Sequence, residues 1–220
     1  MQTTPSLSKI RGFTLIELLT VIAIIGILAA IIIPTTGAVR NAAKKAQVKS
    51  MFSQWTTAFN LYKQEYGFFP NIGTDGTDNL LSTKNDTLEF VRAFTAKELN
   101  GTDTTVANLN GNKRRQAFYS FSDAELPSST ELLTDAYGNT QFGVIWDANG
   151  DGVIKVSGAS KDGDIQSVAG VDGGTFTPST GSNSTDDIPT DGIKAGVIFY
   201  SAGKSGATPI SNKDAVMSWK

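Results

Sequence analysis

An almost unbroken apolar run from Phe13 to Ile33 constrains this chain more than any other feature. The run contains 21 residues and one charged side chain, Glu17. As a helix it would be about 30 Å long, which matches the hydrocarbon core of a bilayer. A carboxylate in such a segment costs about 2.5–3.5 kcal/mol at mid-helix and less near the interface. The run therefore predicts a membrane-length helix whose single acid needs a partner.

A short basic leader precedes the run. Lys9 and Arg11 stand just before Gly12. By the positive-inside rule these cations predict a cytoplasmic N-terminus and an exported C-terminal part. The alternative is an ordinary signal peptide or membrane anchor with a stray acid. The apolar region of a signal peptide would have about 7–15 residues without acids and would end in a small-residue cleavage site, which is not evident after Ile33.

The N-terminus resembles that of the type IV pilin and type II secretion pseudopilin superfamily at Lys9, Arg11, Gly12, Phe13, Thr14, Leu15, Ile16 and Glu17. The resemblance implies that a prepilin peptidase cuts the Gly12–Phe13 bond and that the new N-terminal Phe13 is methylated. It also implies a helical homopolymer built on an inner-membrane assembly platform with minor pseudopilins. The apolar helix would form the filament core, with the head in the periplasm.

Cleavage would leave a cationic amine at Phe13, one helical turn from Glu17. Opposite charges in an apolar environment attract strongly, but each also carries a desolvation cost. If the amine of an incoming subunit meets Glu17 of its neighbour, both costs fall and the axial register is fixed. Farther along, Pro34 removes a backbone hydrogen bond from the helix. It marks either a bend or local unwinding within the filament, as in the superfamily, or a plain membrane exit.

Composition limits the remaining functions. The chain has 220 residues and a net charge of −2, and loss of the two leader cations would make it −4. This acidity argues against nucleic-acid binding. The absence of histidine and cysteine excludes Ser–His and Cys–His catalysis and histidine-based zinc sites. We expect a structural subunit, not an enzyme, with a leader (1–12), a membrane or filament-core half-helix (13–36) and a globular head (37–220).

The head is predicted to be α+β, with the long helix packed on a small antiparallel sheet. Large apolar residues recur at helical spacings of 4, 3, 4, 3 and 4, which predicts a core stripe ending near Gly67: Val48, Phe52, Trp55, Phe59, Tyr62 and Tyr66. A second helix, capped by Asn85 or Asp86, should run through Phe94. A short strand is expected at Ala117–Phe121. Further strands are expected at Gln141–Trp146, Gly196–Tyr200 and Ala215–Trp219, and residues 157–192 read as a long surface excursion.

Two further stretches resemble the major pseudopilin of type II secretion. They are Leu61–Pro70, where the long helix should end, and the turn Asp135–Asn139. They favour a pseudopilus subunit that drives protein export. A pilin of a surface type IV pilus, used for adhesion, motility or DNA uptake, is the nearer alternative because it shares the whole N-terminus. A membrane-tethered enzyme or binding module is the more distant one.

Residues 147–153 read as the first half of a calcium loop. Asp147, Asn149 and Asp151 place oxygen ligands at alternate positions, and Val153 offers a backbone carbonyl. The twelfth loop position is Gly158 instead of a glutamate, so Asp162 or Asp164 would complete the site. The same residues could form a polar hairpin turn. A second calcium-bearing loop is implied near the C-terminus by resemblance, but Ser205 replaces its usual acid and Asp214 alone cannot make a site.

Overall fold

A computed structural model of the chain describes residues 12–70, 72, 80–105, 111–158, 162–181, 187–204 and 213–220, without the side chains of residues 34 and 35. The predicted leader, apart from Gly12, lies outside the described residues. The chain divides into two compact units, residues 1–42 and 43–220. The three-part division into leader, half-helix and head stays a prediction.

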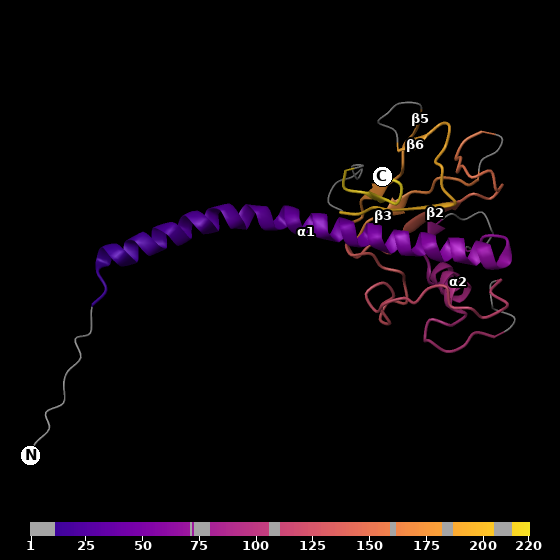
Figure 1. Ribbon diagram of the computed structural model, residues 1–220, viewed down its shortest axis with the longest axis horizontal. Helices are drawn as coiled ribbons and strands as arrows, with labels where there is room; N and C mark the ends of the chain where they lie inside the picture. The colour runs from indigo at the N-terminus through magenta and orange to yellow at the C-terminus, as the bar shows by residue number, and fades with distance from the viewer. Residues whose placement is uncertain are drawn as a thin grey trace, which may run out of the picture. The chain divides into compact units, whose positions relative to one another are not determined.

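Helix α1 (Leu15–Tyr66) is the first element of the chain (Figure 1). In the first unit its apolar side chains are exposed, with Ile22, Ile25 and Leu28 each more than half accessible. Among the described residues, α1 alone is long and apolar enough to cross a membrane. Its backbone stays helical through Pro34. A bend at Pro34 inside a filament therefore stays a prediction.

In the second unit, the predicted stripe of α1 is the centre of the core. Its members from Val48 to Tyr62 are fully buried, and Tyr66 packs against them. The ring of Trp55 lies 5.1 Å from that of Phe90 and 5.3 Å from that of Phe142, between centroids. These contacts join α1 to the second helix and to the sheet. The helix ends as predicted, with Gly67 in the left-handed region at φ +83°.

The main sheet of the described residues has four strands in the order β1-β2-β7-β8, all antiparallel. Their bounds are β1 Leu80–Leu81, β2 Phe142–Trp146, β7 Val197–Ser201 and β8 Val216–Met217. Three of the four strands expected from the sequence are thus present, although the last is shorter than expected. Phe142, Val144 and Phe199 point toward α1, as the alternation of a strand requires. The α+β prediction is confirmed.

The opposite face of this sheet is also covered. Ile145, Ile198 and Tyr200 pack there against apolar residues of the 154–193 region, namely Ile154, Val168, Phe176 and Ile188. This region forms the antiparallel pair β3 (Val168–Ala169) and β4 (Thr175–Phe176) and the parallel pair β5 (Thr180–Gly181) and β6 (Ile188–Pro189). The described parts of the expected surface excursion are therefore a second packed layer.

Helix α2 (Lys84–Thr95) lies where a helix was predicted, but its N-cap is different. Thr83 caps it, and Asp86, at the third helical position, accepts hydrogen bonds from the Thr83 and Ser82 backbone N–H groups at 2.8 and 3.0 Å. The expectation that Asn85 or Asp86 is the cap was wrong, because Thr83 has the extended backbone that a cap requires. The strand expected at Ala117–Phe121 is also absent; this segment is irregular.

Candidate functional site

The predicted assembly residue Glu17 lies in the first turn of α1, where it pairs with Thr14. The Thr14 backbone N–H donates to Glu17 Oε2 at 2.8 Å, and the Thr14 hydroxyl donates to the same oxygen at 2.7 Å. In return, the Glu17 N–H donates to Thr14 Oγ1 at 3.4 Å. This is a capping box, which satisfies N–H groups that an isolated helix end would leave unpaired. The sequence Thr-x-x-Glu carries this signal, which sequence analysis missed.

The capping box brings the predicted processing site and Glu17 together. Phe13, expected to become the new N-terminus, directly precedes Thr14, and its side chain is 75% exposed. Both hydrogen bonds that Glu17 accepts in the capping box go to its Oε2 atom. Among the described residues, no group donates a hydrogen bond to its Oε1 atom. Glu17 can therefore cap its own helix and still offer one oxygen to a cation. The role of Gly12, Phe13 and Glu17 in processing and assembly stays a prediction.

The predicted calcium loop folds around its own aspartates. Asp147 is buried, and its two oxygens accept from the N–H groups of Gly150 and Gly152 at 2.7 and 3.0 Å. Asn149 Oδ1 accepts from the Asp151 N–H at 2.8 Å. Asp151 Oδ1 accepts in the same way from the Val153 N–H at 2.8 Å. Each of these three side chains thus accepts hydrogen bonds from backbone N–H groups of the same loop.

Asp162, which follows the loop in sequence, accepts hydrogen bonds from backbone N–H groups at both ends of it. Its Oδ1 accepts from the Ala148 N–H at 3.1 Å, and its Oδ2 accepts from the Lys155 N–H at 2.8 Å. Two lysines supply positive charge. Lys155 Nζ lies 3.0 Å from Asp151 Oδ2, and Lys63 Nζ lies 3.9 Å from Asp147 Oδ2.

The lysine at position 155 affects the titration of its partner. The hydrogen bond from the Lys155 ammonium to the Asp151 carboxylate is the main reason that the pKa of Asp151 is lowered. The same bond raises the pKa of Lys155. Within the described residues, no three acidic side chains gather around one point. The donors are nevertheless all oxygen, which suits a hard cation. A calcium ion here would need the Asn149 amide oxygen and the Val153 carbonyl besides the aspartates.

The Asp135–Asn139 turn, which the sequence singled out, forms a buried polar network. Asp135 Oδ2 accepts from the Ser201 hydroxyl and the Asn139 side-chain amide at 2.8 and 2.9 Å. The same amide donates to the Gly203 carbonyl at 2.8 Å. Burial raises the pKa of Asp135 although these hydrogen bonds oppose it. The turn therefore anchors the end of β7. The C-terminal loop at Ser205 lies outside the described residues.

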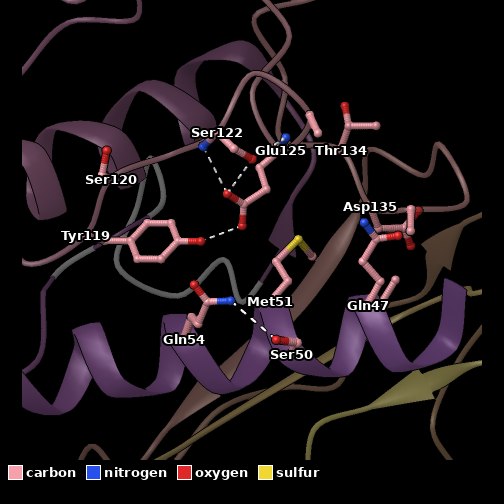
Figure 2. Close-up of a pocket in the computed structure, with 13 residues that line it drawn as sticks. Gln47, Ser50, Met51, Gln54, Tyr119, Ser120, Ser122, Glu125, Thr134 and Asp135 are labelled. Atoms are coloured by element: carbon pink, nitrogen blue, oxygen red, sulfur yellow. Dashed lines mark hydrogen bonds between the residues drawn. The ribbon is translucent and has the colours of Figure 1, made fainter. Parts of the chain in front are cut away.

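A cavity of about 330 Å³ lies between α1 and the segment 119–136 (Figure 2). On its far wall, Glu125 accepts from the Tyr119 hydroxyl and from the N–H and hydroxyl of Ser122. Met51 and Gln54 of α1 line the opposite wall. Burial and the Glu125 hydrogen bond raise the pKa of Tyr119, so its phenol stays protonated. These polar groups bind one another and hold the segment in place.

Comparison with known proteins gives one match. A family model described as the prokaryotic N-terminal methylation motif matches residues 7–33. No curated protein and no solved structure matches the chain. The motif supports a type IV pilin-like protein whose N-terminus is processed by a prepilin peptidase, and its family consists of structural subunits. The matched residues include the leader residues and the apolar run on which the resemblance in the sequence is based.

Proposed function

We propose that the chain is a structural subunit of a type II secretion pseudopilus. A prepilin peptidase would remove residues 1–12, and the mature subunit would wait in the inner membrane as a single-pass protein with a periplasmic head. Subunits would then polymerise through α1 into a periplasmic filament that drives protein export. No residue is assigned a catalytic role.

One observation carries this proposal: the methylation motif at residues 7–33 coincides with an exposed, membrane-length helix. Apolar side chains from Leu15 to Ile33 that the chain itself leaves exposed need a lipid or helical partner. The lipid bilayer would cover these side chains before assembly, and the helices of neighbouring subunits would cover them in the filament. The Leu61–Pro70 and Asp135–Asn139 stretches are what favours the pseudopilus over a surface pilus.

In the proposed filament, the Phe13 amine of one subunit pairs with Glu17 of the next. The structure allows a sharp test, because Glu17 also caps its own helix. Glutamine can take the third position of a capping box, so Glu17→Gln keeps the cap and loses the charge. Glu17→Ala loses both. If charge pairing sets the register, both variants are inserted and processed, but neither assembles.

The measurement is filament yield in the native host, with processing followed by mass spectrometry. Thr14→Val is the matched control because it removes the two capping bonds of the Thr14 hydroxyl and leaves the carboxylate. Normal filaments from Glu17→Gln but not from Glu17→Ala would mean that the cap matters and the charge does not. Deleting the gene distinguishes a secretion pseudopilus from a surface pilus. Loss of protein export in a host whose surface fibres are unaffected would fit a pseudopilus. Lost surface fibres with normal export would contradict this proposal.

Calcium in the 147–153 loop is a separate part of the proposal. Asp147, Asn149, Asp151 and the Val153 carbonyl would hold the ion, whose bound charge would rigidify the loop. The side-chain oxygens of Asp147, Asn149 and Asp151 in one loop support this, although no three acidic or other metal-binding side chains group there among the described residues. Calorimetry with calcium should give binding heat for the wild type and none for Asp151→Ala. No heat and no thermal shift in the wild type would leave a plain hairpin turn.

A further inference from the structure

Asn149 and Gly150 form an exposed asparagine–glycine pair in the 147–153 loop. In such a pair the backbone nitrogen of the glycine can attack the side-chain carbonyl of the asparagine, because glycine has no Cβ to hinder the approach. Ammonia leaves and a five-membered succinimide ring forms, which water opens to aspartate or isoaspartate. Nothing lies within 4 Å of the position that a Cβ would take on Gly150, so no neighbouring group crowds this glycine.

Two hydrogen bonds of the loop act on the atoms that react. The Gly150 N–H donates to Asp147 Oδ1 at 2.7 Å, so a buried carboxylate already holds the proton that the attacking nitrogen must lose. The Asp151 N–H donates to Asn149 Oδ1 at 2.8 Å. It polarises the carbonyl under attack and faces the oxygen on which negative charge develops. The N–H proton lies in the plane of the peptide, whereas the nitrogen attacks through the face of that plane, so proton removal and attack do not compete for space.

We propose that Asn149 is a site of self-catalysed deamidation in which Asp147 is the general base. Asp147 takes the Gly150 N–H proton as the Gly150 nitrogen bonds to Asn149 Cγ. The Cγ–Nδ2 bond then breaks, and the proton leaves with Nδ2 as ammonia. Water adds to the ring and gives a carboxylate at position 149, so the net reaction consumes water and releases ammonia.

A second asparagine–glycine pair is an internal reference. Asn100 and Gly101 are also exposed, and Gly101 has φ +80°, close to the φ of +77° at Gly150. Asn100 Oδ1 accepts from the Thr102 N–H at 3.0 Å and from the Thr102 hydroxyl at 2.7 Å, so two donors polarise its carbonyl. The base is what differs. The Gly101 N–H donates to the Glu98 backbone carbonyl at 2.9 Å, and this neutral group cannot take the proton at neutral pH.

Deamidation at Asn149 adds negative charge to a loop that already carries Asp147 and Asp151. The aspartate product places carboxylates at positions 147, 149 and 151, the alternate positions at which a hard cation takes oxygen ligands. Cation affinity is tuned by the number of charged ligands, so the reacted loop should hold a divalent cation more tightly than the fresh one. The reaction itself needs neither the proposed filament nor a bound calcium ion.

The full chain in detergent, kept with EDTA in water enriched in the heavy oxygen isotope, provides the test. Each deamidation during the incubation incorporates a labelled oxygen, which separates it from older product. Mass spectrometry of tryptic peptides, with fragmentation to locate the site, gives the rates at Asn149 and Asn100. A positioned base contributes about 10²–10⁴-fold in enzymes, so Asn149 should react at least about tenfold faster than Asn100. In concentrated urea, where both loops are unfolded, the two rates should become similar.

Two variants test the role of the base. Asp147→Asn keeps an oxygen that can accept the Gly150 hydrogen bond but removes the base, so the rate at Asn149 should fall to near that at Asn100. Lys155→Gln is the matched control. It removes the ion pair of the same loop with Asp151, whose carboxylate lies 3.0 Å from Lys155 Nζ, and leaves Asp147 in place. The rate at Asn149 should stay well above that at Asn100 in this variant.

Equal rates at Asn149 and Asn100 in the folded chain would overturn the proposal. The same holds if Asn149 keeps its advantage in urea, because local sequence alone would then explain it. An unchanged rate in folded Asp147→Asn, or an equal loss of rate in Lys155→Gln, would exclude Asp147 as the base. If Asp147→Asn does not fold, the wild-type comparison between folded and unfolded chain still decides.

Discussion

Replacing Gly143 by alanine tests how the central strand pair is built. Gly143 of β2 stands opposite Tyr200 of β7. The tyrosine ring fills the space above the glycine: a Cβ there would lie 1.9 Å from Cζ and 2.3 Å from both Cε atoms. Carbon atoms in contact are normally about 3.5–4.0 Å apart, so the ring would have to move by more than about 1 Å.

The ring has little room to move. Tyr200 is fully buried, and its hydroxyl donates to the Gln166 carbonyl and accepts from the Gln166 N–H, both at 2.9 Å. Overpacking a core costs about 1–3 kcal/mol, and leaving buried polar groups unpaired costs about 1–3 kcal/mol each. With the Tyr200 hydroxyl as the one group left unpaired, Gly143→Ala should therefore lower the free energy of unfolding by about 2–6 kcal/mol, a large share of the usual 5–15 kcal/mol.

Urea unfolding of the full chain in detergent, followed by tryptophan fluorescence, measures this loss. Gly37→Ala is the control, because nothing lies within 4 Å of the added Cβ and the helix gains propensity. Adding Tyr200→Ala to Gly143→Ala should give a total loss smaller than the sum of the single losses. An unchanged urea midpoint for Gly143→Ala, or strict additivity, would refute the packing described for this pair.

Three further predictions concern the head. Thr83→Ala removes the cap of α2 and should lower the free energy of unfolding by about 1 kcal/mol, whereas Lys84→Ala should change it by less than about 0.5 kcal/mol. Hydrogen bonds, chiefly from Arg92, lower the pKa of Glu98 below 4.5. Its stabilisation relative to Glu98→Gln should therefore be complete above that pH and disappear as pH falls through the lowered pKa, in urea titrations across pH. Asp187→Asn should cost about 1.5–3 kcal/mol by the same assay, since it discharges a buried partner of Lys220; no change would show that the pair is not needed.

The elements with strong local signals could be predicted from the sequence. The aromatic stripe of α1 has helical spacing, so its burial and its end at Gly67 followed directly. Strands β2 and β7 lie within one residue of their expected bounds, because each is a compact apolar run between turn residues. The α2 cap was missed by two or three residues. The signal was present, since Thr83 and Asp86 have the spacing of a capping pair, as do Thr14 and Glu17.

The second layer of the head could not be predicted in this way. Its anchors Ile154, Val168, Phe176 and Ile188 stand 14, 8 and 12 positions apart in mostly polar sequence. No helical or strand period links them, so only tertiary packing brings them together under the sheet. The candidate site likewise has parts that the sequence could predict and parts that it could not. The sequence located Glu17 and the 147–153 loop, but it could not show that Lys45 of α1 donates a hydrogen bond to the Lys213 carbonyl, more than 160 positions away.

The short outer strands of the sheet have a consequence for how subunits meet. In the described chain, β1 and β8 each have two residues, and layers cover both faces between them. Such short edge strands offer a neighbouring chain almost no backbone to pair with, which protects the head against fibrillar aggregation. In the proposed filament, growth would then depend on the apolar part of α1.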